Sequence, residues 1–181
     1  MEIVIILGLI FLNGILSMSE IAMVSARKSR LETAAKKGSK TAKTALRLAN
    51  EPDRFLSTIQ IGITLIGILT GLYSGEALAG DLARWLETIG IPQAHSLTLA
   101  KGIIVILVTY LTLILGELVP KHLGMNAPEK IARLIARPME VLSKIASPFV
   151  WLLSASTQAV IRLTGLHAST ENKVTEEEIK A

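Results

Sequence analysis

Long apolar runs alternate with charged segments along the chain. Three runs, residues 3–26, 55–79 and 102–119, are predicted to be membrane spans, because a helix needs about 17–25 apolar residues to cross a bilayer. Pro120 follows the third run and is expected to stop its helix. No Lys or Arg precedes the first run, so it is predicted to be an uncleaved span and not a signal peptide. The pattern predicts an all-α membrane protein with three transmembrane helices and cytoplasmic-side interfacial helices.

Two segments outside these runs are also predicted to be helical. Residues 27–50 are rich in Ala, Lys and Leu and are expected to form a helix near anionic headgroups, with a solvated linker as the alternative. Residues 139–165 are mostly apolar, but Pro148 interrupts them and Lys144 and Arg162 stand at their edges. We expect a broken helix at the cytoplasmic interface there, with a fourth span as the alternative.

These elements define three expected parts of the chain. Residues 1–137 are predicted to form a three-span ion-transport domain that includes a basic cytoplasmic segment, 27–54. Residues 138–168 are predicted to be juxtamembrane interfacial helices. Residues 169–181 are expected to begin a linker to a cytoplasmic domain, since Thr175 and Glu178 have the spacing of a capping box.

The distribution of Lys and Arg predicts the orientation. Residues 27–54 carry nine Lys and Arg against three Asp and Glu, whereas residues 81–101 carry two of each. Basic residues favour the cytoplasmic side. We therefore expect an extracytoplasmic N-terminus, a cytoplasmic C-terminal half and a multi-pass protein of the inner (plasma) membrane.

Composition excludes several other classes of protein. Half of the 181 residues are apolar, and the mean hydropathy is +0.51. There is no cysteine, which excludes disulfides and thiolate chemistry, and the three histidines have no metal-ligand spacing. The basic residues flank apolar spans and form no nucleic-acid-binding motif, so we expect no nucleic-acid partner. No hydrolase triad or phosphate-binding loop is present, so we expect no enzyme.

Polar residues gather at one depth of the predicted membrane domain, in its cytoplasmic half. An ionisable side chain there is expensive and indicates a functional site. On the first span, Asn13, Ser17 and Glu20 lie on one side of the helix. The same spacing places four residues on one side of the second span: Gln60, Thr64, Gly67 and Gly71.

The third span ends with a proline that changes the hydrogen bonding of Gly116. Pro120 has no N–H, so the Gly116 carbonyl loses its helical partner beside the Glu117 carboxylate. Oxygen ligands of this kind suit hard cations such as Mg²⁺, Ca²⁺ or Na⁺. Lys121 is expected to be a cytoplasmic anchor that can form an ion pair with Glu117. The alternatives are a simple helix stop at Pro120 and a Glu20 side chain that extends to the headgroups.

Three motifs together resemble one known family. LNGILSMSEIAMVS, STIQIGITLIGILTGLYSG and LGELVPKHLGMNAPEKIA resemble the transmembrane domain of the CorC/cyclin M (CNNM) magnesium transporters. The resemblance implies a homodimer, Mg²⁺ efflux coupled to Na⁺ entry, and nucleotide regulation through a cytoplasmic pair of CBS domains. It also implies ion-binding roles for seven residues: Ser17, Ser19, Glu20, Gln60, Thr64, Gly116 and Glu117.

A membrane-anchored Mg²⁺ sensor that does not itself transport is the alternative function. Intramembrane carboxylates favour transport, because an anchor needs none, and no filter-like repeat indicates a channel. We expect one ion site inside each protomer. The Gln60 and Thr64 face is expected to pack against the first and third spans, which leaves the aliphatic sides of the second and third spans for the dimer contact.

Overall fold

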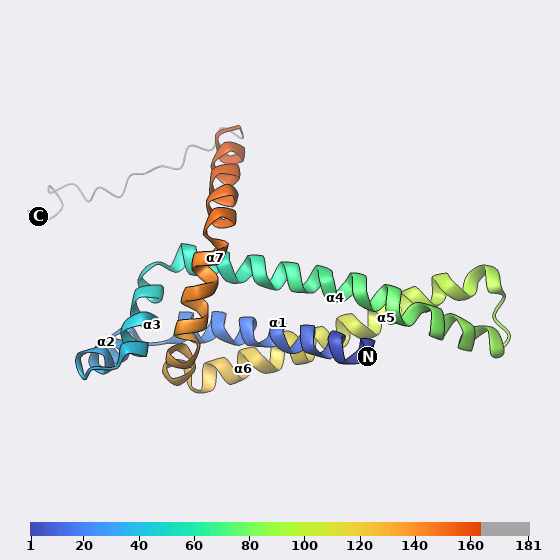
Figure 1. The fold of residues 1–181 in the computed structure, drawn as a ribbon, viewed down its shortest axis with the longest axis horizontal. Helices are drawn as coiled ribbons and strands as arrows, with labels where there is room; N and C mark the ends of the chain where they lie inside the picture. Colours follow the sequence, from blue (N-terminus) through green and yellow to red (C-terminus); the bar gives the residue numbers. More distant parts are fainter. Residues whose placement is uncertain (164–181) are drawn as a thin grey trace, which may run out of the picture. The chain divides into compact units, whose positions relative to one another are not determined.

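Residues 1–163 of the chain are described by a computed structural model, and they are helical with short connections. The elements in chain order are α1 (Glu2–Ser25), α2 (Lys28–Lys36), α3 (Lys40–Asn50), α4 (Pro52–Thr88), α5 (Gln93–Leu113), the π-helix η1 (Ile114–Leu118), α6 (Val119–Asn126) and α7 (Pro128–Leu163) (Figure 1). The described part contains no strand. The all-α prediction is therefore confirmed, while the predicted capping box at Thr175 and the linker 169–181 lie outside the described residues.

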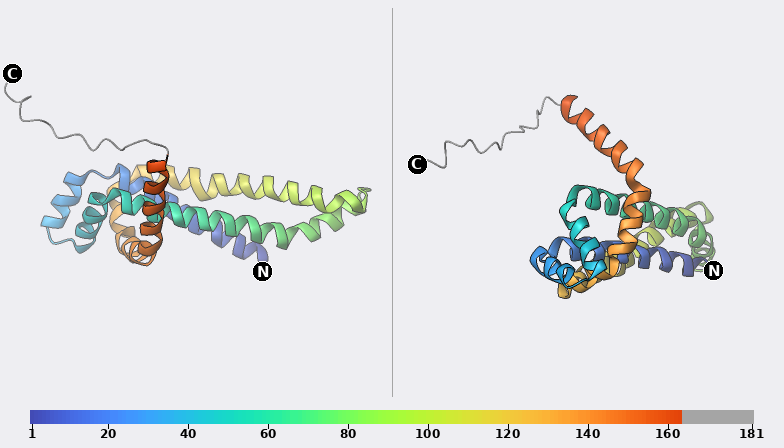
Figure 2. Two further views of the ribbon diagram at one scale, coloured as in Figure 1. Left: turned by 90° about the horizontal axis from the view of Figure 1, so that it is seen from above. Right: turned by 60° about the vertical axis from the view of Figure 1, so that its left-hand side comes forward.

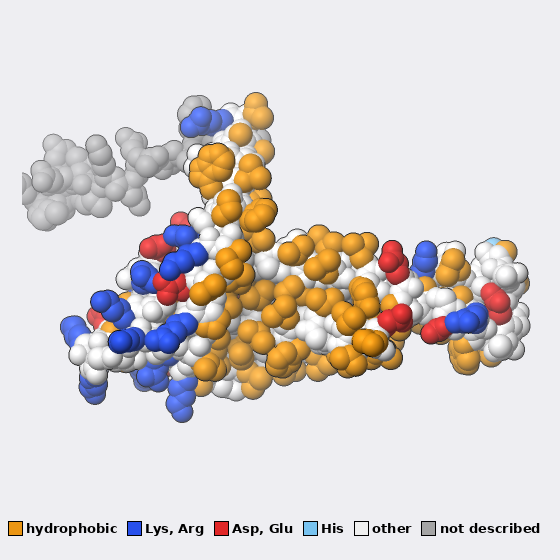
Figure 3. Space-filling model, in the orientation of Figure 1, with side chains coloured by type: hydrophobic (Ala, Val, Ile, Leu, Met, Phe, Trp, Pro, Cys, Tyr) orange, Lys and Arg blue, Asp and Glu red, His pale blue; other side chains and the backbone are white. Residues whose placement is uncertain are grey.

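Three helices are long and apolar enough to cross a membrane. They are α1, α4 and the continuous stretch Gln93–Asn126, which α5, η1 and α6 form together. Within residues 1–146, hydrophobic side chains cover the long middle of these helices, while Lys and Arg gather over α2 and α3 (Figure 3). A broad apolar surface of this kind is the one that lipid requires. The prediction of three spans is confirmed.

The second and third membrane helices are longer than the sequence predicted. Helix α4 has 37 residues and ends at Thr88; at 1.5 Å per residue it is about 55 Å long, against about 30 Å for the apolar core of a bilayer. Helix α5 returns beside it, and the pair extends past the N-terminus of α1 (Figures 1 and 2). Ala83 and Leu86 pack against Ala100 in this extension. That packing explains why the helices continue beyond their apolar runs.

Helices α2 and α3 replace the single helix that was predicted over 27–50. Gly38 separates them with a φ of +91°, a conformation that glycine adopts without strain. The Ser39 side chain then accepts a hydrogen bond from the Ala42 N–H at 3.3 Å and caps α3. The segment is helical as expected, but this glycine and serine divide it into two short helices.

The basic end of the membrane domain has its own apolar core. Leu16 and Met23 of α1, Leu31 of α2, Leu48 of α3, Phe55 and Ile59 of α4, and Ala132, Ile135 and Met139 of α7 pack together there. Each of these side chains is nearly or fully buried. The core fixes α2, α3 and the first part of α7 against the C-terminal half of α1 and the N-terminal end of α4.

Helix α7 runs without interruption from Pro128 to Leu163. The expected break at Pro148 was therefore wrong: the proline removes one backbone donor, but the helical bonds on both sides of it continue. The chain divides into two compact units between Ala146 and Ser147, directly before this proline. Helix α7 is not among the candidate membrane spans of the described residues.

Candidate cation-binding site

Helix α1 and the η1–α6 segment lie unusually close together. A Cβ added to Gly14 would stand 2.9 Å from Pro120 Cγ and 3.0 Å from the Leu115 carbonyl oxygen. One added to Gly124 would stand 2.8 Å from the Met18 carbonyl oxygen. Contacts this short leave room only for glycine. The order of these contacts also shows that α1 and η1–α6 run in the same direction.

Pro120 does not stop the third membrane helix, contrary to the sequence prediction. The helix instead changes to π-helical hydrogen bonding over Ile114–Leu118, and the Val119 N–H donates to the Ile114 carbonyl, five residues back. Pro120 then occupies the first turn of α6, where its missing N–H costs little. The chain continues as a helix to Asn126, and the irregular turn lies beside α1. Single π-helical turns of this kind are frequent at functional sites.

The Gly116 carbonyl meets the side chain of Asn13 within this turn. Asn13 Nδ2 donates a hydrogen bond to the Gly116 oxygen at 3.1 Å, and both residues are buried. The other amide atom, Asn13 Oδ1, is buried without a hydrogen-bond partner among the described residues. An orphan buried acceptor costs about 1–3 kcal/mol and is a position where an ion or a water molecule is expected.

Asn13 is therefore the main residue that the predicted ligand set omitted. The sequence did place it on the polar side of the first span, with Ser17 and Glu20. It could not show that the Asn13 amide bonds the carbonyl that Pro120 releases. The spacing from Gly116 to Pro120 was the available signal, since it marks a carbonyl that needs another donor.

Glu117 forms an ion pair with Lys121, which the sequence indicated as a possible partner. Lys121 Nζ lies 2.7 Å from Glu117 Oε1, one helical turn away. The Lys121 and Glu117 side chains are 32% and 40% exposed, so the pair lies at the surface of the single chain. The Glu117 carboxylate, which was predicted to bind a metal ion, is thus already paired with the Lys121 ammonium group.

The remaining predicted ligands of α1 differ from one another in burial and in their level along the helix. Ser17 and Ser19 are buried, and Ser19 Oγ donates to the Ile15 carbonyl oxygen at 2.6 Å. Glu20 is half-buried. Since Met18 lies against Gly124, Glu20 is about seven residues, or about 10 Å along the axis, from the level of Glu117. The two carboxylates therefore lie at different levels.

The polar and glycine face of α4 does not pack inside the protomer, contrary to the sequence prediction. Gln60 and Thr64 are exposed, and a Cβ added at Gly67 or Gly71 would meet nothing within 4 Å. Helix α4 turns another side toward α1, where Gly62 stands against Leu16. Helical periodicity groups residues on a face, but it does not say which face finds a neighbour.

Most of the possible ligands here are neutral oxygen atoms. Over residues 1–163, no group of three or more His, Cys, Asp or Glu is arranged to hold a metal ion. The junction of α1 with η1 instead offers the Asn13 amide and the Glu117 carboxylate, with the Ser17 hydroxyl one turn from Asn13. Such a set suits weakly held hard cations and not soft metals.

Comparison with known proteins identifies the family. The family model described as the cyclin M transmembrane N-terminal domain matches residues 4–181. The chain belongs to this family. The resemblance that the three sequence motifs indicated is thereby confirmed, and the match covers the π-helical turn as well as all three spans.

Several curated bacterial proteins are similar to the chain over nearly its whole length. UPF0053 protein sll0260 of Synechocystis is 47% identical over 99% of this chain, and UPF0053 protein YhdT of Bacillus subtilis is 32% identical over 91%. The polyamine export protein of Escherichia coli is 30% identical over 99%. The chain spans 36% to 40% of the length of these relatives. The comparisons fit a role in membrane transport and indicate no catalytic enzyme family.

Proposed function

We propose that this chain is the membrane domain of a cation transporter that exports Mg²⁺ in exchange for Na⁺ entry. The carboxylate, hydroxyl and amide oxygens near the π-helical turn support a hard cation as the substrate. Family membership supports transport as the activity. The coupling to Na⁺ rests on the resemblance to the CorC/cyclin M transporters.

One observation carries the choice of site: the buried Asn13 Oδ1 atom that has no partner among the described residues. In the proposed site this oxygen binds Mg²⁺, and the hydrogen bond from Asn13 Nδ2 to Gly116 holds the amide in position. Ser17, one turn along α1, supplies a hydroxyl. Glu117 supplies the negative charge beside the same turn.

Lys121 has a specific role in this proposal. Its ammonium group neutralises Glu117 through the 2.7 Å ion pair, and Mg²⁺ competes with it for the carboxylate. A carboxylate that is neutralised between binding events lowers the cost of a charge near lipid. Glu20, Gln60 and Thr64 are assigned to the path that the ion follows, since they lie away from the Asn13 amide or on the exposed face of α4.

Family membership also supports a proposal for the wider assembly. We propose a homodimer in the inner membrane, with an extracytoplasmic N-terminus and a cytoplasmic pair of CBS domains that regulates transport. The relatives are more than twice as long as this chain, which leaves room for such domains. A membrane-anchored Mg²⁺ sensor is the alternative if the site binds the ion without moving it.

A polyamine is the second candidate substrate. One relative is named as a polyamine export protein, and Glu20 and Glu117 lie about 10 Å apart along the helix axis. Two separated carboxylates match the separated ammonium groups of a polyamine better than they match one small ion. The amide and hydroxyl oxygens near Asn13 favour Mg²⁺ instead.

Titration calorimetry on the purified chain tests the site and the substrate together. Replacing Asn13 by Leu removes the orphan oxygen and is expected to weaken Mg²⁺ binding about ten-fold, as loss of one charge-assisted contact would. Replacing Gln93 by Leu, which removes an exposed amide at the start of α5, is the matched control and should change Mg²⁺ affinity less. Tighter binding of spermidine than of Mg²⁺ by the parent chain would favour the polyamine. Unchanged Mg²⁺ affinity in Asn13→Leu would refute the site.

A further inference from the structure

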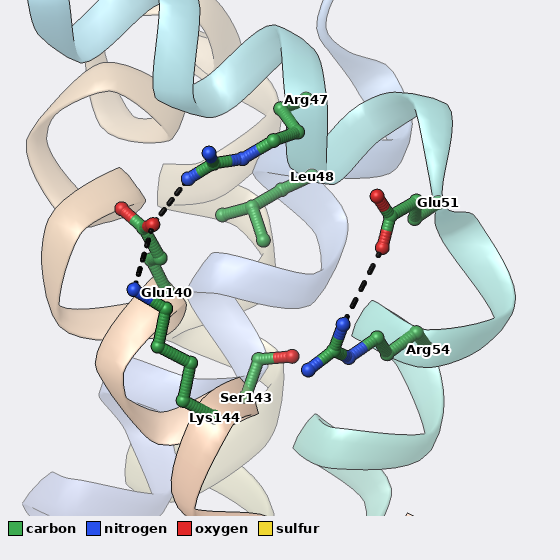
Figure 4. Close-up of a pocket in the computed structure, with 7 residues that line it drawn as sticks. All are labelled: Arg47, Leu48, Glu51, Arg54, Glu140, Ser143 and Lys144. Atoms are coloured by element: carbon green, nitrogen blue, oxygen red, sulfur yellow. Dashed lines mark hydrogen bonds and ion pairs between the residues drawn. The ribbon is translucent and has the colours of Figure 1, made fainter. Parts of the chain in front are cut away.

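A pocket lies at the basic end of residues 1–146, apart from the cation-binding site. It has a volume of about 220 Å³ and is enclosed by the end of α3, the start of α4 and one turn of α7. Its lining residues are Arg47, Leu48, Glu51, Arg54, Glu140, Ser143 and Lys144 (Figure 4). Three separate helices thus bring three basic side chains to one small cavity.

The charges of the pocket leave an excess of hydrogen-bond donors. Glu140 Oε1 accepts a hydrogen bond from Arg47 and lies 3.3 Å from Lys144 Nζ. The hydrogen bond from Lys144 and the charge of Arg47 lower the pKa of the Glu140 carboxyl below its usual value, so Glu140 is ionised at neutral pH. One carboxylate oxygen therefore serves two cations, each of which has further N–H groups.

Arg54 is held more loosely on the other side of the pocket. Its guanidinium lies 3.7 Å from Glu51 Oε2, and both side chains are about half exposed, at 44% and 55%. The buried Ser143 hydroxyl points toward Arg54 across the cavity (Figure 4). Three basic side chains against two carboxylates leave the pocket with a net positive charge, and the ion pair of Arg54 is the longer one, with the more exposed carboxylate.

The pocket lies between charged residues and apolar ones, as the binding site of a lipid headgroup would. The apolar run of α4 begins at Phe55, directly after Arg54, so the pocket lies where a membrane helix leaves the bilayer. Beside it on α7, Val141 and Ile145 are 57% and 66% exposed and share one side of the helix. A basic cavity next to an exposed apolar strip fits a ligand with a phosphate at one end and an acyl chain at the other.

We propose that this pocket binds the phosphate of an anionic phospholipid. Arg47, Arg54 and Lys144 donate to the phosphate oxygens, and the exposed apolar side of α7 contacts the acyl chains. Arginine suits this role because its planar group presents paired donors to a phosphate. Glu51 and Glu140 hold the basic side chains in position around the cavity. A bound lipid would join α3, α4 and α7 at the membrane surface, independently of which cation the domain transports.

Native mass spectrometry of the purified chain tests this proposal with defined lipids. The parent is expected to retain phosphatidylglycerol more strongly than phosphatidylcholine. Replacing Arg54 by Gln should lower phosphatidylglycerol retention about five-fold, the effect of one basic residue near an anionic surface. Lys43→Gln is the matched control, since Lys43 is an exposed lysine of α3 outside the pocket. It should change retention less than two-fold, about the effect of a distant screened charge.

A second variant separates a pocket from a diffuse basic surface. Ser143→Leu fills the cavity without changing its charge and should lower phosphatidylglycerol retention as Arg54→Gln does. Thermal unfolding of each variant confirms that it is folded. Equal retention of the two lipids by the parent, or equal losses in Arg54→Gln and Lys43→Gln, would overturn the proposal. Displacement of the lipid by an equal concentration of inorganic phosphate would assign the pocket to free phosphate and would overturn the lipid assignment.

Discussion

At the scale of single residues, the candidate site is defined by which oxygen atoms already have partners. The Gly116 carbonyl accepts from Asn13, and Glu117 Oε1 accepts from Lys121. The Ser19 hydroxyl donates to a backbone carbonyl in its own helix. Asn13 Oδ1 is the buried side-chain oxygen that has no partner in residues 1–163. The unsatisfied acceptor and the nearby carboxylate are the two features on which the proposed cation site rests.

Replacing Lys121 by Gln tests the competition at Glu117. The change removes the ammonium group that lies 2.7 Å from the carboxylate, so Mg²⁺ no longer has to displace it. We expect Mg²⁺ affinity to rise about five-fold, since one partly exposed ion pair contributes up to about 1 kcal/mol. Lys130→Gln removes an exposed positive charge elsewhere and should leave Mg²⁺ affinity nearly unchanged. Weaker binding in Lys121→Gln would mean that Lys121 does not compete with the ion. Titration calorimetry measures the Mg²⁺ affinity of both variants.

Residue patterns predicted some of this site and missed other parts for identifiable reasons. The spacing of Glu117 and Lys121 was sufficient to predict their ion pair, because residues four apart on a helix are neighbours. The spacing of Gln60 and Thr64 correctly placed them on one face but gave no information about its neighbour. The bond from Asn13 to Gly116 joins residues that are 103 positions apart, which no local pattern reveals.

At the scale of secondary-structure elements, glycines set the distance between α1 and the third membrane helix. A Cβ added at any of three glycines would come within 3.2 Å of an atom of the opposite helix; they are Gly14, Gly116 and Gly124. The close approach brings the Asn13 amide within reach of a backbone carbonyl. It also explains why the π-helical turn lies against α1, since a backbone carbonyl such as that of Gly116 needs a donor from the protein at membrane depth.

Replacing Gly124 by Ala tests this packing. The new Cβ would lie 2.8 Å from the Met18 carbonyl oxygen, so the helices must separate, at a cost of about 1–3 kcal/mol. Gly8→Ala on α1 is the control, because a Cβ there meets nothing within 4 Å. We expect thermal unfolding in detergent to show a lowered midpoint for Gly124→Ala alone. Equal midpoints in the two variants would contradict the close packing.

At the scale of the whole molecule, the three spans were predictable and their lengths were not. Hydropathy locates a span because lipid requires an apolar helix. It does not predict that α4 continues to Thr88, since this extension is stabilised by packing on α5 and not by lipid. Hydropathy also does not predict the division of 27–50 into two helices, which depends on Gly38 and on the cap at Ser39.

The orientation of the domain is a prediction at this scale. Nine basic residues between the first two spans, against two in residues 81–101, predict that α2 and α3 are cytoplasmic. Single cysteines at Lys40 and Gln93, both exposed, report the side of the membrane through a reagent that cannot cross it. We expect labelling from outside at position 93 alone. Labelling from outside at position 40 alone would reverse the topology.

The exposed face of α4 changes the expected dimer contact. The aliphatic sides of the second and third spans were predicted to form it, but Gln60, Thr64, Gly67 and Gly71 have no neighbour in the described protomer. Small residues let membrane helices approach closely, and polar side chains between them are removed from lipid. We propose that the two copies of α4 meet at the Gly67 and Gly71 end of this face, related by a two-fold axis, which leaves Gln60 and Thr64 to the ion path.

Replacing Gly67 by Leu tests the dimer. The bulky side chain should separate the two helices and shift the mass in nanodiscs from dimer to monomer, while Gly8→Leu on α1 should leave the dimer intact. A Mg²⁺ titration of the resulting monomer shows whether each protomer keeps its own site; we expect one ion per chain. A dimeric Gly67→Leu variant would exclude this face as the contact. One ion per two chains in the parent would exclude a site within each protomer.

Mg²⁺ flux into liposomes, with and without a Na⁺ gradient, tests the central claim most directly. The first variant, Glu117→Gln, keeps the size of the side chain and removes its charge. The control, Glu76→Gln, removes an exposed carboxylate from the C-terminal half of α4. The proposed site predicts that Glu117→Gln lowers Na⁺-dependent Mg²⁺ flux by about ten-fold or more, the cost of one charge-assisted ligand, and that Glu76→Gln transports like the parent. Parental flux in Glu117→Gln would contradict the account.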